Sequence, residues 1–117
     1  MPSAFKSIGD AEFAAEVLQS ERPTIVFFWH PWSDPCRYFV PALEGFAAQH
    51  AEDAKLVKVN VQEHQASANQ ARIAAIPALL LYQGGQVVAD LIGTCTEPEL
   101  AAMFQKAREL GQGKKGT

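Results

Sequence analysis

The chain has 117 residues, 48% of them hydrophobic and 20% charged, and a formal net charge of −3. This length predicts a single domain that can bury a hydrophobic core without disulfide or metal cross-links. The weak negative charge excludes an electrostatic case for nucleic acid or an anionic membrane surface as a partner. No apolar run approaches the roughly 18 residues that a transmembrane helix needs.

Cysteine content and the chain ends predict the cellular setting. Cys36 and Cys95 are the two cysteines, too few for a disulfide framework, so we expect a cytoplasmic protein in a reducing compartment. The N-terminus lacks the charged-then-apolar layout of a signal peptide. We expect one domain over residues 1–110 and a flexible tail over residues 111–117.

The first half of the chain predicts alternating strands and helices. A weak strand is predicted near residues 4–8, and Asp10 is the expected N-cap of a helix that runs to about residue 19. The β-branched and aromatic run at 24–29 predicts a central strand buried on both faces. The next helix should begin near Asp34-Pro35, because proline is tolerated in a first turn. Another strand is predicted at 55–61.

The second half predicts a short helix, a hairpin and a long helix. The short helix covers residues 63–71, and two strands flank the turn Gln83-Gly84-Gly85. Thr96 and Glu99 form a capping box at the start of the last helix, which should end at Gly111. This order predicts an α/β fold, with a mixed central sheet of four or five strands and helices on both faces.

Several segments, in a fixed order over about residues 5–108, indicate a family. "VFFWHPWSDPC" is similar to a family segment in which a strand leads into Trp-Cys-Gly-Pro-Cys. "CRYFVPAL" is similar to the helix that follows that motif, and Pro41 stands at the position of the proline in that helix. "LVKVNV", "AAIPALLLYQGG" and "LIGTCTEPEL" are similar to the later strands, the Ile-Pro segment and the glycine loop. Together these segments resemble the thioredoxin family. The resemblance implies the thioredoxin fold, a cis bond before Pro77 and a peptide-binding groove.

Two positions depart from the pattern that this resemblance implies. Ser33 stands where the family has its nucleophilic cysteine, and Phe27 stands where it has a buried acid, whereas Trp32, Pro35 and Cys36 are kept. Disulfide exchange needs an attacking thiolate and a second, resolving thiol, and a serine hydroxyl supplies neither. We therefore interpret Ser33 as a helix-entry residue that bonds a backbone N–H. A serine-hydrolase alternative lacks a recognisable acid beside His30, the candidate base nearest to Ser33.

The two thiols leave alternatives open. Cys36 is either a buried small hydrophobe or a monothiol that accepts glutathione or a partner's cysteine. Cys95 is either an ordinary loop residue or a replacement redox partner for Cys36, which would need Cα atoms about 4.4–6.8 Å apart. Phe27 has no carboxylate, so this position cannot accept a proton from the Cys36 thiol. The scattered histidines do not show zinc-ligand spacing, and neither a metal nor another cofactor is predicted.

The sequence therefore predicts a binding module with a divergent SDPC motif and little or no dithiol-disulfide reductase activity. Protein or peptide partners would dock by strand addition, with Trp32 as an exposed aromatic contact. The predicted groove comprises Trp32, Asp34, Pro35, Ile76, Pro77 and Gly93. The alternative is a thiol-disulfide oxidoreductase in cell redox homeostasis, acting through Cys36 alone or through a Cys36/Cys95 pair.

Overall fold

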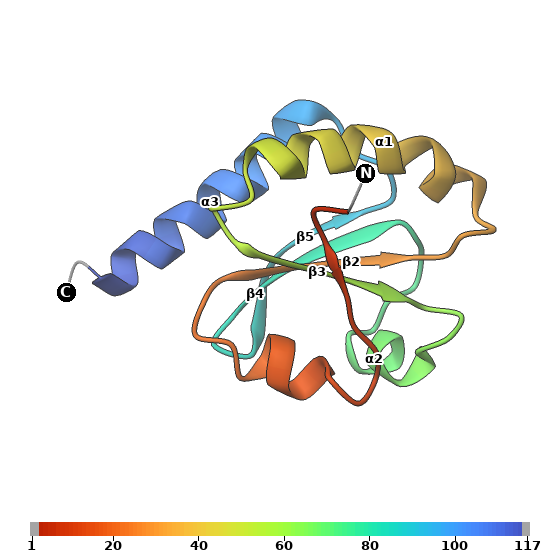
Figure 1. Ribbon diagram of the computed structural model, residues 1–117, viewed down its shortest axis with the longest axis horizontal. Helices are drawn as coiled ribbons and strands as arrows, with labels where there is room; N and C mark the ends of the chain where they lie inside the picture. Colours follow the sequence, from red (N-terminus) through yellow and green to blue (C-terminus); the bar gives the residue numbers. More distant parts are fainter. Residues whose placement is uncertain (1–2, 116–117) are drawn as a thin grey trace.

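Five strands and four helical segments make up the computed structural model, which describes residues 3–115. The strands lie side by side in the order β1-β3-β2-β4-β5 (Figure 1). In chain order the elements are β1 (Lys6–Ser7), the π-type helix η1 (Ala14–Leu18), β2 (Thr24–Trp29), α1 (Asp34–Gln49), β3 (Lys55–Asn60), α2 (Gln65–Gln70), β4 (Ala78–Gln83), β5 (Gln86–Ile92) and α3 (Glu97–Lys115).

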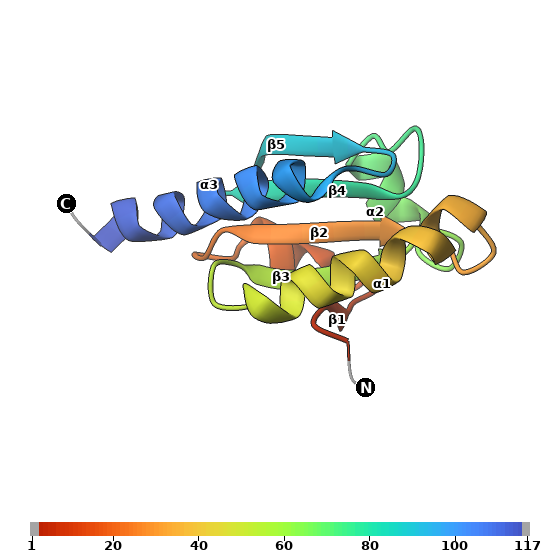
Figure 2. The same cartoon turned by 90° about the horizontal axis from the view of Figure 1, so that it is seen from above.

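The sheet is mixed, as the alternation of predicted elements required. Strands β1, β2 and β3 run parallel, whereas β4 is antiparallel to both β2 and β5. Helices α1 and α3 cover one face, and η1 and α2 cover the other (Figures 1 and 2). The prediction of a mixed α/β sheet with helices on both faces is therefore confirmed.

The central strand β2 explains why its sequence is apolar throughout. Ile25 and Phe27 belong to the core under α1 and α3, whereas Val26 and Phe28 belong to the core under η1 and α2. All four side chains are at most 1% exposed. Successive strand residues point to opposite faces, so a strand covered on both sides cannot alternate with polar residues.

One end of the sheet gathers the segments that the resemblance singles out. Phe28 near the end of β2 pairs with Ala78 at the start of β4, and Ala78 pairs with Ile92 at the end of β5. The β2–α1 loop, the segment before β4 and the segment after β5 therefore leave the sheet at the same end. Register alone brings Ser33, Pro77 and Gly93 to neighbouring loops.

The prediction that Asp10 caps the first helix is wrong. The first helix is the short π-type η1, and Phe13 precedes it without a side-chain capping bond. Asp10 instead accepts hydrogen bonds from the backbone N–H and the hydroxyl of Ser67, at 2.8 and 2.7 Å. Ser67 lies in the first turn of α2, where backbone N–H groups have no partner inside the helix. Asp10 thus caps a helix far away in the chain.

The last helix also differs from its predicted length. Its capping box is confirmed: Thr96 N donates to a Glu99 carboxylate oxygen at 2.8 Å, and Glu99 N donates to Thr96 Oγ1 at 3.3 Å. However, α3 continues past Gly111 to Lys115. A helical glycine costs only about 1 kcal/mol, so it does not force a stop where the chain keeps helical backbone. Residues 116–117 of the predicted tail lie outside the described residues.

Within the described residues, no helix is both long and apolar enough to cross a membrane.

Candidate functional site

Ser33 is the N-cap of α1. Its backbone is extended, with φ −86° and ψ 118°, and its Oγ accepts a hydrogen bond from Cys36 N at 3.4 Å. Pro35 lies in the first turn, where the missing N–H costs nothing. Cys36 is only 1% exposed. At the start of α1, therefore, the Ser33 hydroxyl caps the helix and the Cys36 thiol is buried.

No carboxylate takes the place of the acid that the resemblance leads one to expect on β2. Phe27 is 1% exposed, and its ring centroid lies 5.7 Å from that of Phe5 and 6.4 Å from that of Phe39. On the neighbouring strand, Lys58 places its amino group 5.4 Å from the centroid of the Trp29 ring. This is a cation–π contact, and it gives the lysine an aromatic partner. Position 27 of β2 thus contributes to an aromatic cluster of the core and offers no proton acceptor.

The loop before α1 exposes a large aromatic side chain. Trp32 is 77% exposed, although it lies between buried β2 and the start of a helix. Its backbone N–H donates to His30 Nδ1 at 3.0 Å, and the Ser33 N–H donates to the His30 carbonyl at 3.1 Å. From the sequence, we considered His30 only as a candidate base for Ser33 and as one of the scattered histidines without zinc-ligand spacing. The sequence signal for this bond is a histidine two residues before Trp32, in the loop between a predicted strand and a predicted helix.

Two further apolar side chains are exposed on elements that begin or end at this end of the sheet. Tyr38, in the second turn of α1, is 84% exposed, and Ile92, at the end of β5, is 51% exposed. Neither was predicted, because helical and strand periodicity do not show which surface residues stay uncovered. Large exposed apolar side chains are typical of surfaces that bind partners where they form a contiguous patch.

The segment before β4 and the loop after β5 are joined by a backbone hydrogen bond. The Ile76–Pro77 peptide bond is cis. Gly93 N donates to the Pro77 carbonyl at 2.7 Å, and Gly93 has φ +85°, a conformation that favours glycine. Pro77 is buried, whereas Ile76 is half-buried against the core under η1 and α2. Ile76, Pro77 and Gly93 are thus brought together, as predicted from their loops.

Cys95 lies half-buried between Gly93 and the cap of α3. Burial raises the pKa of the Cys95 thiol, and the negative charge of Glu99 raises it further. Both effects disfavour the thiolate, which is the reactive form. Cys36 and Cys95 are both free thiols in the structure. The geometry therefore does not show a disulfide pair in place of the missing cysteine at position 33.

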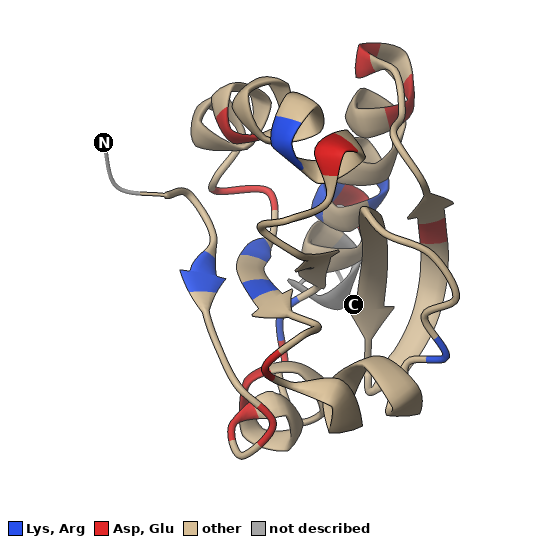
Figure 3. Ribbon diagram, turned by 90° about the vertical axis from the view of Figure 1, so that its right-hand side faces the viewer, with Lys and Arg blue, Asp and Glu red and all other residues tan. Residues whose placement is uncertain are grey.

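Charged groups at the end of the sheet that contains Ser33, Pro77 and Gly93 are of both signs. Asp34 and Arg37 are exposed and pair on α1 at 3.5 Å. Figure 3 looks onto this end of the molecule and shows acidic and basic residues scattered over separate elements. Among the described residues, no cluster of three or more His, Cys, Asp or Glu side chains could hold a metal ion.

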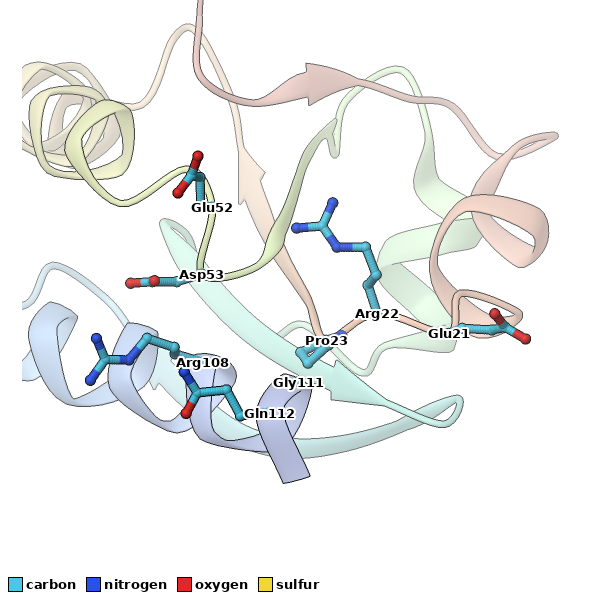
Figure 4. Close-up of a pocket in the computed structure, with 8 residues that line it drawn as sticks. All are labelled: Glu21, Arg22, Pro23, Glu52, Asp53, Arg108, Gly111 and Gln112. Carbon is cyan, nitrogen blue, oxygen red and sulfur yellow. The ribbon is translucent and has the colours of Figure 1, made fainter. Parts of the chain in front are cut away.

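A cleft of about 800 Å³ opens at the opposite end of the sheet, beyond the starts of β2 and β3 (Figure 4). It is walled by charged side chains and the last turns of α3, and it contains none of the predicted site residues. Its lining residues are Glu21, Arg22, Pro23, Glu52, Asp53, Arg108, Gly111 and Gln112. In Figure 4 the side chains of Arg22 and Arg108 point in different directions, so they do not converge on a common ligand position.

Comparison with known proteins decides the family. The family model for thioredoxin matches residues 4–106. The chain belongs to the thioredoxin family. It is 38% identical over 104 residues to a thioredoxin of Synechocystis sp., covering 89% of this chain and 97% of the relative.

Other relatives agree with this family. A thioredoxin of Haemophilus influenzae is 40% identical over 94 residues, covering 80% of this chain and 88% of the relative. One of Streptomyces clavuligerus is 39% identical over 93 residues, covering 80% and 86%. Within the thioredoxin family, the functional question for this chain is whether the helix entry with Ser33 performs disulfide chemistry or only binding.

Proposed function

We propose that this thioredoxin-family protein binds extended polypeptide segments of partner proteins without turning over disulfides. One observation carries the proposal. The position that would hold the attacking thiolate holds a hydroxyl engaged in capping α1, and the remaining thiol of the motif, on Cys36, is 1% exposed. Disulfide exchange requires an accessible thiolate, so the helix entry lacks the group that begins the reaction.

The surrounding surface supports docking. Trp32 supplies a large exposed aromatic side chain, and tryptophan is enriched among the residues that dominate binding energy at interfaces. Ala75 is exposed beside half-buried Ile76, so an incoming chain can reach the backbone before Pro77. Backbone hydrogen bonds to an extended segment would then give affinity, and apolar contacts with Trp32 and Ile76 would give selectivity.

A second candidate is a thiol-disulfide oxidoreductase that acts through Cys36. The relatives named thioredoxin favour it, as does the retention of Cys36 itself. In the monothiol version, a Cys36 thiolate attacks a partner's disulfide, forms a mixed disulfide and releases the partner's other sulfur as a thiolate. A second thiol, from glutathione or from Cys95, would have to resolve that mixed disulfide. The low exposure of Cys36 and the raised pKa of Cys95 weigh against it.

Binding is tested with insulin B chain whose cysteines are carboxymethylated, an extended apolar polypeptide that cannot form mixed disulfides. Titration calorimetry should detect binding to the parent protein. Trp32→Ala should weaken it by about tenfold or more, whereas Cys36→Ser should leave it unchanged. Circular dichroism confirms that each variant is folded. If the blocked chain does not bind, or binds Trp32→Ala equally well, the groove is not the docking site.

Turnover is tested by the reduction of intact insulin with dithiothreitol. We expect the parent protein not to accelerate this reaction. Ser33→Cys should accelerate it, because a thiol at the N-terminus of α1 would have its thiolate stabilised by the helix dipole and free N–H groups. The double variant Ser33→Cys/Cys36→Ser, which lacks the resolving thiol, is the control and should lose multiple turnover. Acceleration by the parent protein that is lost in Cys36→Ser would establish the second candidate.

A further inference from the structure

The loop that exposes Trp32 is held by consecutive hydrogen bonds. Trp32 N donates to His30 Nδ1 at 3.0 Å, Ser33 N donates to the His30 carbonyl at 3.1 Å, and Cys36 N donates to Ser33 Oγ at 3.4 Å. Two of the three acceptors belong to His30. The first of these bonds fixes the backbone of the exposed tryptophan to an imidazole ring.

That bond requires one protonation state. A ring nitrogen of histidine accepts a hydrogen bond only when it carries no proton, so the His30 ring must be neutral with its proton on Nε2. Protonation turns Nδ1 into a donor that faces the Trp32 N–H. The amide then loses its acceptor, and two N–H groups oppose each other at the same place. Imidazole is the side chain whose charge ordinarily changes between pH 5 and 8.

No charged neighbour forms an ion pair with the His30 ring among the described residues. Asp34 pairs with Arg37, and Lys58 lies over Trp29. His30 is itself half-buried. The ionisable residues at this end of the sheet come from the first turns of α1 (Asp34, Cys36, Arg37 and Tyr38), from β3 and the segment after it (Lys58, Glu63 and His64), and from the residue after the C-cap of α2 (Arg72).

We propose that His30 is a positioning residue that makes the presentation of Trp32 dependent on pH. With a neutral ring, the loop holds Trp32 in one arrangement for an incoming polypeptide; with a protonated ring, that arrangement is released. The docking step rests on the proposed function, whereas the release of the loop is a property of the free protein. Acidification therefore weakens binding at Trp32 through the His30 ring and not through thiol chemistry.

The free protein tests the positioning role alone. Amide hydrogen exchange of Trp32, followed by NMR and expressed as protection relative to the unfolded rate, should fall about two- to tenfold from pH 8 to pH 5. His30→Asn should keep its protection at both pH values, because an asparagine oxygen accepts from the N–H two residues on and does not titrate. His30→Ala should show the low protection at both. His64→Asn is the matched control and should follow the parent, since it replaces another imidazole that lies in a different loop.

Binding of the carboxymethylated insulin B chain extends the test to the site. The parent should lose about two- to tenfold in affinity between pH 8 and pH 5, and His30→Asn should lose none of this. If Trp32 protection has the same pH profile in the parent and in His30→Asn, the positioning role is overturned, whatever the peptide does. If protection depends on His30 but the blocked chain binds at neither pH, the positioning role stands and the proposed function falls.

Discussion

At residue 33, an oxygen in place of a sulfur changes what the start of α1 can do. The hydroxyl of Ser33 accepts the Cys36 N–H and so satisfies a backbone group that the helix leaves unpaired. A cysteine at this position would be a weaker acceptor and a far better nucleophile. Phe27 acts in the same direction, because its buried ring fills the core where a carboxylate could have moved a proton. Ser33 thus contributes to capping and Phe27 to packing, and neither side chain can take part in thiol chemistry.

Gly9 shows how a single missing side chain fixes the position of a histidine. A Cβ built on Gly9 would lie 2.6 Å from His64 Cε1, well inside van der Waals contact. The ring cannot move freely, because Asp10 N donates to His64 Nδ1 at 3.3 Å. Gly9→Ala should therefore lower the free energy of unfolding by about 1–3 kcal/mol, measured by urea denaturation.

Gly45 provides the matched control for this substitution. It lies exposed inside α1, and a Cβ there would meet no atom within 4 Å. Gly45→Ala should raise the free energy of unfolding by about 0.5–1 kcal/mol, because alanine restricts the unfolded chain more than glycine does. Equal effects of the two substitutions would show that the contact of Gly9 with His64 does not constrain the fold.

At the scale of elements, α2 ends in a strained residue. Arg72 has φ +58°, and the N–H groups of Arg72 and Ile73 donate to the carbonyls of Asn69 and Ala68 at 3.1 and 3.0 Å. This is the Schellman arrangement, in which glycine is the usual left-handed residue. Arg72→Gly should raise the free energy of unfolding by about 0.5–1 kcal/mol, since it removes the steric cost of a side chain in that conformation.

Ala71, the residue before Arg72, provides the control for a general effect of glycine at the end of α2. Ala71 has ordinary right-handed backbone, with φ −79° and ψ −5°. Ala71→Gly should lower the free energy of unfolding by about 0.5–1 kcal/mol in the same urea measurement. Stabilisation by both substitutions would mean that flexibility, and not relief of a left-handed residue, is responsible.

The hydrogen bonds that Asp10, in the loop after β1, accepts from Ser67 of α2 should weaken in acid. The hydrogen bond from the Ser67 hydroxyl is the main cause that lowers the pKa of Asp10 below its ordinary value of 3.8. The lowered pKa means that ionised Asp10 stabilises the fold above about pH 4 and that this contribution is lost as pH falls through the folded-state pKa. Asp10→Asn should therefore lower the melting temperature at pH 7, and its difference from the parent should shrink below pH 3.8.

Asp90→Asn is the control for this acid response, because Asp90 is an exposed carboxylate on β5. Its melting temperature should follow that of the parent at every pH. A constant difference between Asp10→Asn and the parent from pH 7 to pH 2.5 would show that the Asp10 charge plays no part in the link.

At the scale of the whole molecule, β5 leaves one edge of the sheet open. The pairing of β4 with β5 shifts between Leu81 and Tyr82, so Val88 is an extra residue in a bulge. Lys106 of α3 reaches this bulge and donates to the Val88 carbonyl at 2.9 Å. Bulges and lysines at edge strands prevent the pairing of edges between molecules. Lys106→Met, which keeps the aliphatic stem but removes the donor, should increase self-association.

Size-exclusion chromatography with light scattering measures this effect over a range of protein concentrations. Lys106→Met should show concentration-dependent dimers or larger species. Arg108→Met is the control, since it removes another exposed cation from α3 without touching Val88. Identical elution of the parent and both variants would mean that the bulge alone protects the edge.

Features that depend on residues close in sequence could be predicted from the sequence. The apolar run of β2, the hairpin at Gly84-Gly85 and the Thr96–Glu99 cap each involve neighbours within a few positions. The order of strands and helices then restricted the sheet to a mixed arrangement. The absence of a thiol at Ser33 was likewise determined by the sequence, because the reaction needs sulfur whatever the fold.

Tertiary structure decided the features that depend on packing between distant segments. Asp10 is a good capping residue in any sequence, but its partner Ser67 lies 57 positions away and could not be identified from local pattern. Packing likewise leaves Tyr38 and Ile92 uncovered, although both are apolar residues in predicted elements, and it buries Cys36, for which the sequence had left two interpretations open. Periodicity reports which face of one element is apolar, whereas exposure depends on which other elements pack against that face. Those long-range contacts form only in the folded chain, so the sequence pattern could not show that Tyr38 and Ile92 stay exposed.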